Sequence, residues 1–318
     1  MSTGSANEAA PVEATTPVVR IGTRASRLAR TQTQTVADAL TAAGLRIEVV
    51  PMTSEGDRNR ASLASLGGTG VFAAALRTAL LAGECDAVVH SLKDLPTTPH
   101  PGLVVAATPA REDARDALCA RDGLTLATLP AGARIGTGSP RRAAQVRTAR
   151  PDLEVVDIRG NVDTRLGFVS DGELDAVILA AAGLRRIGRA DAITAELALD
   201  TWPGAPGQGV LAVEIREGDA TGTPLAAALA GIHDADAWAA ATAERSLLAT
   251  LEAGCAAPVG ATATVSDGVL TVSGSAYRPG GGESRTATAS GRPDEAAALG
   301  SAVAADLIAA GAGAWITG

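Results

Sequence analysis

The sequence predicts an α/β protein with two similarly built lobes, followed by a small α+β domain. Three observations favour this fold class. The chain has 318 residues, more than one typical domain needs. Apolar runs alternate with helical patterns through most of its length, as in proteins with parallel sheets. From about residue 235 a helix, three short strand candidates and a last helix replace that alternation.

The first unit begins near residue 18. A short strand leads into a helix over residues 23–44, which Gly44 ends, and a second strand follows over 45–52. In this βαβ start, a Gly-Thr turn feeds the N-terminus of a helix, where free backbone N–H groups favour an anion. Arg24 and Ser26 lie at that turn. An ordinary strand-to-helix connection would look the same, so the turn alone leaves both interpretations open.

Residues 53–70 are polar and rich in glycine, which predicts a mobile loop. A loop of this length is usually a lid or a binding loop. A helix over residues 71–84 and a buried strand over 86–89 come next.

Ionisable side chains follow that strand directly: His90, Ser91, Lys93 and Asp94. Ligands in open parallel sheets bind at the carboxyl ends of strands, so chemistry is expected here. Lys93 is the only lysine among 27 basic residues. The pKa of a lysine ammonium shifts readily when the group is buried, whereas the guanidinium of an arginine stays charged. A solvated loop with a surface ion pair is the alternative, and the rest of the chain favours the site.

A second unit repeats the first. Residues 133–160 again give a strand, a Gly-Thr turn, a helix and a strand, and a buried strand follows at 175–179. In this alignment Gly22 matches Gly136, and Asp86 matches Asp175. The repeat predicts two lobes that face a shared cleft.

Arginines are concentrated in the second unit. Residues 131–150 contain five of them and no acid, and four more follow by residue 186. Arg141 and Arg142 begin the predicted helix, where the helix dipole, free N–H groups and both side chains would favour a carboxylate or phosphate. For Arg147, Arg150 and Arg185 a solvated helix face is the preferred interpretation.

The last third holds two further features. Residues 202–216 are predicted as a glycine-rich return into a strand of the first lobe. Cys255 follows Gly254 and precedes Pro258, which predicts a thiol on a constrained loop. Most isolated cysteines are inert packing residues, so position alone does not make Cys255 reactive.

Composition excludes several classes. A net charge of −8 and 2% aromatic residues argue against a nucleic-acid binder. Three scattered cysteines give neither a disulfide framework nor a zinc site, so we expect no metal and a reducing compartment. Residues 1–16 contain no basic residue and no apolar core, which predicts a disordered tail of a cytoplasmic protein without membrane contact.

Seven blocks carry a resemblance to a known family. They are IGTRASRLARTQ (21–32), HSLKDLPT (90–97), GSPRRAAQ (138–145), RPDLEVVDIRGNVDTRL (150–166), LAAAGLRRIG (179–188), GAPGQGVLAVE (204–214) and AERSLLATLEAGCAAPVGA (243–261). In this order and spacing they resemble porphobilinogen deaminases, also called hydroxymethylbilane synthases, from about residue 18 to the C-terminus.

The resemblance implies three domains after a tail over residues 1–17. Two are lobes of the type II periplasmic-binding-protein kind: domain 1 over 18–110, completed by about 210–230, and the arginine-rich domain 2 over 111–209. Domain 3, over 231–318, would carry the cofactor-attachment Cys255.

The implied activity is that of a transferase in porphyrin and haem biosynthesis. It joins four porphobilinogens head to tail, releases ammonia at each addition, and hydrolyses off the linear tetrapyrrole hydroxymethylbilane. We expect a monomer that contacts porphobilinogen and the growing polypyrrole chain.

The resemblance also implies roles for individual residues. Cys255 would hold a dipyrromethane cofactor through a thioether, and Asp94 would be the catalytic carboxylate, with Lys93 beside it. The residues expected to bind the cofactor with them are Thr137, Ser139, Arg141 and Arg142. The residues expected to bind substrate carboxylates are Arg24, Ser26, Arg159, Arg165, Arg186 and Gln208.

The chemistry agrees with these roles. Loss of ammonia leaves an electron-poor methylene on a pyrrole, which a thiolate or the next pyrrole carbon can attack. A carboxylate near the pyrrole nitrogens stabilises that cation and can exchange protons.

The sequence departs from the family at four positions. Thr69 replaces a common Lys, Gly138 and Pro140 replace Ser and Leu, and Ala253 replaces Gly. The first change weakens the expectation that the 53–70 loop supplies a cation to the substrate.

Two rival classes fit less well. A non-catalytic anion-binding module has no use for Cys255 and commonly carries an export signal. A dinucleotide-dependent enzyme needs a full glycine-rich fingerprint, which neither IGTRAS nor GTGSPR supplies.

Overall fold

The computed structural model describes residues 17–52, 71–253 and 257–316. The predicted tail up to residue 16, the predicted loop over 53–70 with Thr69, and Cys255 lie outside these ranges. In the described part no helix is long and apolar enough to cross a membrane.

Lobe 1 is built on a five-stranded sheet with the order β2-β1-β3-β10-β4. Its strands are β1 (Val18–Arg24), β2 (Arg46–Met52), β3 (Ala87–Ser91), β4 (Leu103–Ala107) and β10 (Leu211–Arg216). The first three are parallel, and β10 runs antiparallel to β3 and β4. Helices α1 (Arg27–Ala42) and α7 (Pro224–Ile232) pack on one face, and α3 (Val71–Leu81) packs on the other.

Lobe 2 has the sheet order β7-β6-β8-β5-β9. Its strands are β5 (Asp116–Ala120), β6 (Arg134–Gly136), β7 (Glu154–Val156), β8 (Ala176–Ala180) and β9 (Ala195–Leu197). Side chains alternate between the two faces, as the pleat requires. Ile178 packs towards α4 (Pro140–Ala149), whereas Val177 and Leu179 pack towards α5 (Val162–Ser170) and α6 (Ala181–Arg186).

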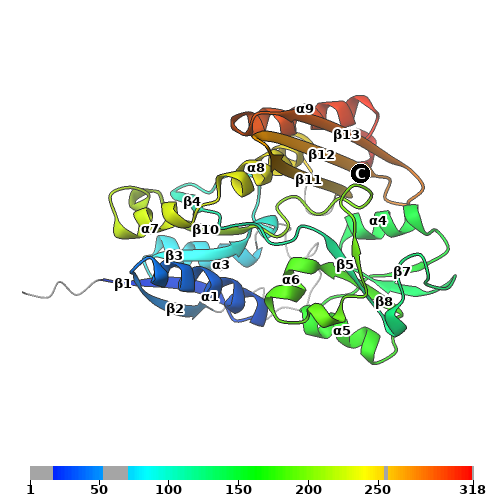
Figure 1. Ribbon diagram of the computed structural model, residues 1–318, viewed down its shortest axis with the longest axis horizontal. Coiled ribbons are helices and arrows are strands. Elements are labelled where there is room, and N and C mark those ends of the chain that lie inside the picture. Colours follow the sequence, from blue (N-terminus) through cyan, green and yellow to red (C-terminus); the bar gives the residue numbers. More distant parts are fainter. Residues whose placement is uncertain (1–16, 53–70, 254–256, 317–318) are drawn as a thin grey trace, which may run out of the picture.

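The internal repeat predicted from the sequence is confirmed by the strand register. Gly22 of β1 pairs with Val88 of β3, and Gly136 of β6 pairs with Val177 of β8. Each sheet also takes its antiparallel fourth strand just after a chain crossing: β5 follows the crossing from lobe 1, and β10 follows the return from lobe 2. The chain therefore crosses twice between the two lobes, which lie side by side (Figure 1).

The C-terminal part is an antiparallel three-stranded sheet, β11-β12-β13, with helices on one face. The elements are α8 (Ala235–Thr250), β11 (Val259–Ser266), β12 (Val269–Tyr277), β13 (Ser284–Gly291), α9 (Ala296–Ala309) and α10 (Gly313–Ile316). In Figure 1 this part lies above the two lobes, with α8 in yellow and the later elements in orange and red.

The predicted fold class, two α/β lobes and a small α+β domain, is confirmed. The domain boundaries stay a prediction.

Candidate functional site at the junction of the lobes

Asp94 ends a single 3₁₀ turn, η1 (Leu92–Asp94), that follows β3 at the carboxyl end of the lobe 1 sheet. Buried Leu92 and Leu95 anchor the turn on either side of the charged pair. The Asp94 carboxylate is exposed, and among the described residues nothing donates a hydrogen bond to it. It is therefore available to a ligand.

Lys93 points from the same turn towards lobe 2. Its ammonium donates to Gln208 Oε1 at 3.2 Å. Burial lowers the pKa of Lys93 to about 8; Asp94 and Asp116 oppose this shift, and Arg142 and Arg141 add to it. Some of the side chain is still exposed, so water tempers the effect. A Lys93 that titrates near pH 8 can both hold an anion and exchange a proton.

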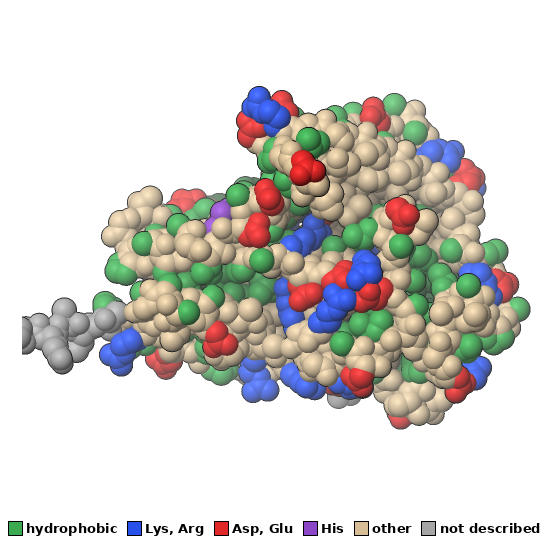
Figure 2. All heavy atoms as spheres, viewed as in Figure 1, with side chains coloured by type: hydrophobic (Ala, Val, Ile, Leu, Met, Phe, Trp, Pro, Cys, Tyr) green, Lys and Arg blue, Asp and Glu red, His purple; other side chains and the backbone are tan. Residues whose placement is uncertain are grey.

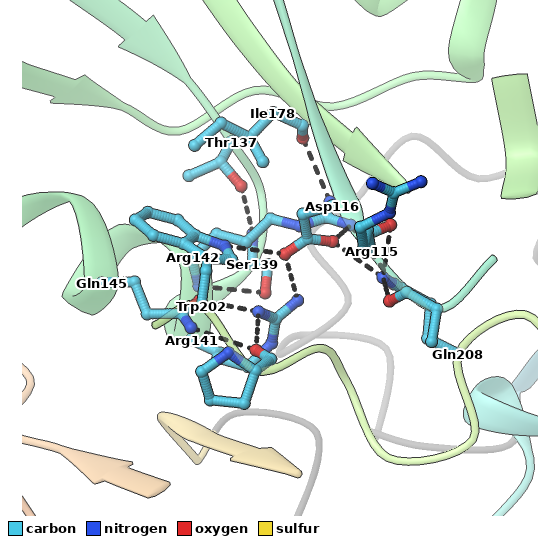
Figure 3. Close-up of polar contacts among 12 residues, drawn as sticks. Arg115, Asp116, Thr137, Ser139, Arg141, Arg142, Gln145, Ile178, Trp202 and Gln208 are labelled. Carbon is cyan, nitrogen blue, oxygen red and sulfur yellow. Dashed lines mark hydrogen bonds and ion pairs between the residues drawn. The ribbon is translucent and has the colours of Figure 1, made fainter. Parts of the chain in front are cut away.

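Arg141 and Arg142 lie at the start of α4, as predicted, but their side chains are buried. Both guanidiniums bind the fully buried Asp116 (Figure 3). Arg141 Nη2 lies 2.8 Å from Oδ2, and Arg142 Nη2 lies 2.7 Å from Oδ1. Trp202 Nε1 donates to Oδ2 at 3.0 Å, and Gln208 Nε2 donates to Oδ1 at 2.9 Å. Asp116 therefore receives four donors from two chain segments.

The charge of Asp116 is fixed by these neighbours. Burial alone would raise its pKa, but the charges of Arg141 and Arg142 and hydrogen bonds from Arg142 and Gln208 hold the pKa well below its usual range. One buried carboxylate thus faces two guanidiniums, with Lys93 attached through Gln208. We call Lys93, Asp94, Asp116, Arg141, Arg142 and Gln208 the inter-lobe site. The site carries a net positive charge, which favours an acidic ligand.

The GQG segment is where the two chain crossings touch. Gly209 has φ +86° and accepts a hydrogen bond from Glu112 N at 3.2 Å. A Cβ atom at Gly209 would lie 2.2 Å from Glu112 O. Glycine is therefore required for backbone conformation and for space. This close approach places buried Gln208 between Lys93 and Asp116.

The predicted hydroxyl residues serve local structure. Ser26 caps α1 by accepting from Ala29 N, and Ser139 caps α4 by accepting from Arg142 N. Thr137 Oγ1 accepts from Ser139 N at 3.2 Å. These hydroxyls orient the helix N-termini that face the site.

Gly138, one of the departures from the family, is explained by packing. A Cβ atom there would lie 2.6 Å from Ile158 O. A side chain at this position would force the GTGS turn away from the β7–α5 loop.

The other predicted arginines lie around the inter-lobe site. Arg165 donates from Nε to Gly160 O at 2.9 Å. Burial lowers its pKa, Arg142 and Arg159 lower it further, and Asp157 and Asp94 oppose the shift. Arg165 of lobe 2 is thus within electrostatic reach of Asp94 of lobe 1.

Two more predicted arginines complete this set. Arg186, at the end of α6, donates to Gly209 O at 2.7 Å, and burial lowers its pKa. Arg24 is half-buried at the carboxyl end of β1. Figure 2 shows Lys and Arg side chains gathered with acidic ones near the middle of the visible face, where the lobes meet.

Arg185 has structural partners, in line with the preference for a non-functional role. It forms ion pairs with Asp113 and Glu196, whose shared partner is Arg115. Asp116 of the inter-lobe site, and Trp202 that donates to it, were not predicted from the sequence. A signal existed for Asp116, since it is the acid that opens the apolar run DALCA.

The residues present fit an acidic pyrrole cofactor. The buried Nε atoms of Arg141 and Arg142 have no hydrogen-bond partner among the described residues. Two such donors beside the Lys93 ammonium match the carboxylates of a dipyrrole better than a neutral ligand.

Fold and site together define a two-lobed α/β protein whose junction between the lobes is suited to an acidic ligand. Residues 19–223 match the family described as porphobilinogen deaminase, dipyromethane cofactor binding domain, and residues 238–309 match the porphobilinogen deaminase C-terminal domain. The chain belongs to the porphobilinogen deaminase family. The predicted family, its dipyrromethane cofactor and its transferase class in porphyrin biosynthesis are thereby confirmed.

Two porphobilinogen deaminases of other organisms are similar in sequence to nearly the whole chain. Porphobilinogen deaminase of Leifsonia xyli subsp. xyli is 58% identical over 313 residues, which cover 95% of each chain. The Thermobifida fusca protein is 53% identical over 307 residues, covering 94% of this chain and 95% of the relative. A periplasmic substrate-binding protein from Coxiella burnetii is 17% identical, covering 68% of this chain and 92% of its own, with a TM-score of 0.43.

Proposed function

We propose that this chain joins four porphobilinogens head to tail, with loss of ammonia at each addition, and hydrolyses off hydroxymethylbilane. The observation that carries the proposal is the inter-lobe site itself. It combines an exposed carboxylate, Asp94, with a buried, net positive cluster. Asp94 can therefore stabilise a cation, and the cluster can bind a carboxylate.

Asp94 is the catalytic residue in this proposal. When ammonia leaves the aminomethyl group of a porphobilinogen, the C–N bond breaks and a positive charge spreads over the pyrrole. The carboxylate stabilises that charge by accepting from the pyrrole N–H groups. After the free α-carbon of the next pyrrole has formed the new C–C bond, Asp94 accepts the proton that this carbon loses.

The lobe 2 cluster has a binding role. Cys255 carries the dipyrromethane through a thioether, and this cofactor supplies the pyrrole end to which the first substrate is joined. Arg141, Arg142 and Lys93 hold its carboxylates, while Thr137 and Ser139 fix the turn beneath. Because Asp116 already orients both guanidiniums, little side-chain entropy is lost on binding.

The remaining arginines bind substrate carboxylates, since each addition brings an acetate and a propionate. The residues proposed for this role are the four arginines Arg24, Arg159, Arg165 and Arg186, together with Ser26 and Gln208. We further propose a cytoplasmic monomer with no nucleic-acid or membrane partner.

Intact mass and ammonia release test the proposal. Protein from a porphobilinogen-competent host should be heavier than its sequence by one dipyrrole, and should release ammonia from porphobilinogen. Cys255→Ser should lose the added mass and most activity. Cys85→Ala is the matched control, because Cys85 is a buried cysteine away from the site. A Cys255→Ser protein that keeps the adduct and full turnover would overturn the anchor role.

A further inference from the structure

Arg245 lies on α8 of the C-terminal part and reaches the turn that carries Lys93 and Asp94. Its guanidinium donates to three backbone carbonyls: Leu92 O at 3.2 Å, Leu95 O at 3.0 Å and Pro96 O at 2.6 Å. These carbonyls flank Asp94 on both sides in the chain. One side chain therefore fixes both ends of the turn.

The turn has few other restraints. Its own backbone contributes the bond from Leu95 N to Leu92 O, and the sheet contributes the bond from Leu92 N to Val210 O. Buried Leu92 and Leu95 pack near Ala241, which is also on α8. The position of the Asp94 carboxylate thus depends on α8 through both apolar packing and the Arg245 bonds.

The same helix leads to the proposed attachment residue. Arg245 precedes Cys255 by ten positions, and α8 ends at Thr250. Burial lowers the pKa of the Arg245 guanidinium, with Arg77 adding to this effect and Glu214 opposing it. A guanidinium held partly out of water and bonded to three carbonyls is well suited to a fixed geometric role.

We propose that Arg245 is a positioning residue, which holds the Asp94 turn in place relative to α8, the helix that precedes Cys255 in the chain. The inference rests on the proposed role of Asp94. It gives the C-terminal part a function in chemistry beyond that of carrying the cofactor.

The test replaces Arg245 by Met, which keeps the aliphatic stem, and by Lys, which keeps the charge and can reach fewer carbonyls. In cofactor-loaded protein, kcat for ammonia release should fall about 100-fold in Arg245→Met, as for a catalytic group displaced by about 1 Å. The value of KM should change less than about threefold, because substrate carboxylates bind elsewhere. Arg245→Lys should recover part of the loss.

Arg216 provides a matched control. It also donates to two backbone carbonyls, Leu80 O and Cys85 O, but at the far end of β10 from the site. Arg216→Met should lower the melting temperature by about as much as Arg245→Met does. It should leave kcat within about twofold of the wild-type value. An Arg245→Met protein with wild-type kcat would overturn the proposal. If that variant does not fold, wild-type kcat in Arg245→Lys has the same meaning.

A double-mutant cycle separates this inference from the proposed function. If Arg245 acts through Asp94, Arg245→Met should slow Asp94→Asn by less than about threefold, far below its effect on the wild type. Full additivity would overturn the positioning role alone. An Asp94→Asn variant with wild-type activity would instead overturn the catalytic role of Asp94.

Discussion

In each of the two sheets the fourth strand is antiparallel and carries a buried carboxylate. The two carboxylates lie at different positions along their strands. Asp116 begins β5 and pairs with Ala180, the last residue of β8, so it lies at the end of the sheet where the lobes meet. Glu214 lies in the middle of β10, opposite Val88 of β3. It binds Arg77 of α3 at 2.7 Å, and His90 Nε2 lies 3.1 Å from it.

Because of this difference in position along the strand, the two carboxylates have different roles. Glu214 joins a helix to the sheet within lobe 1, and its pair with Arg77 leaves no surplus charge. Asp116 joins two chain crossings and two arginines at the junction, and leaves a positive surplus there. Equivalent strands of the two sheets therefore carry one carboxylate that stabilises its lobe and one that, in the proposed function, orients the arginines that bind the cofactor. We expect substitutions at the two positions to differ in what they damage.

Asp116→Asn should have the largest effect. Two buried guanidiniums would lose their counter-charge, which costs about 3–5 kcal/mol of stability. The arginines would also lose their orientation, so cofactor incorporation and turnover should both fall by more than about 100-fold. Urea unfolding, intact mass and ammonia release measure the three quantities. Full cofactor loading in this variant would break the distinction between the two carboxylates.

Glu214→Gln should show comparable destabilisation, about 3–5 kcal/mol, with kcat of the folded fraction within about threefold of wild type. Burial raises the pKa of Glu214, but hydrogen bonds and charges from His90 and Arg77 outweigh it and lower the pKa from 4.5 to about 2. The ionised form thus stabilises the fold above pH 4.5, and this contribution is lost as the pH falls towards 2.

The variant should consequently lose less stability than the wild type between these two pH values. Unfolding titrations at several acidic pH values provide the measurement. Parallel acid dependences in the two proteins would show that Glu214 does not have this role.

Lys93 connects the turn of lobe 1 to Asp116 through Gln208. Substitution of Lys93 should lower turnover less than Asp116→Asn does. With a pKa of about 8, its ammonium is present below that pH and is lost above it. Wild-type turnover should therefore decline above about pH 8. In Lys93→Arg, turnover at pH 7 should fall about tenfold because the guanidinium fits the site poorly, and the decline should move to higher pH. An unchanged pH profile would remove Lys93 from the site.

Substitution of Arg27 should have the smallest effect on stability and turnover. This residue connects the two lobes away from the inter-lobe site. It joins α1 of lobe 1 to lobe 2 by donating to Ile187 O at 2.7 Å, and it lies 3.6 Å from Asp163. Because this contact is largely exposed, Arg27→Ala should shift the melting temperature by about 2 °C or less and leave turnover within about twofold. A loss as large as that of Asp116→Asn would mean that the lobes are joined mainly at their rim.

Much of the fold could be predicted from the sequence, because its signals are local. Gly22 and Gly136 mark equivalent turns, and the apolar runs at 86–89 and 175–179 are equivalent third strands. The location of Lys93 and Asp94 after β3 also followed from the end of an apolar run. These features depend on neighbouring residues, which the sequence displays directly.

The partners of the arginines could not be predicted in the same way. Arg141 and Arg142 look like open anion ligands in the sequence, yet Asp116, 25 and 26 positions earlier, binds both. Likewise Arg245 binds the Asp94 turn about 150 positions away. The first pairing depends on how β5 enters the lobe 2 sheet beside the start of α4, and the second depends on the docking of α8, neither of which a local pattern encodes.

Single-turnover ammonia release by Asp94→Asn tests the central claim most directly, with the cofactor content of each sample checked by intact mass. The side chain is exposed and fixes no described neighbour, so the melting temperature should stay within about 2 °C of wild type. The rate should fall by at least about 100-fold, because an amide can neither accept a proton nor neutralise the pyrrole cation. A cofactor-loaded Asp94→Asn protein that releases ammonia at the wild-type rate would contradict the account.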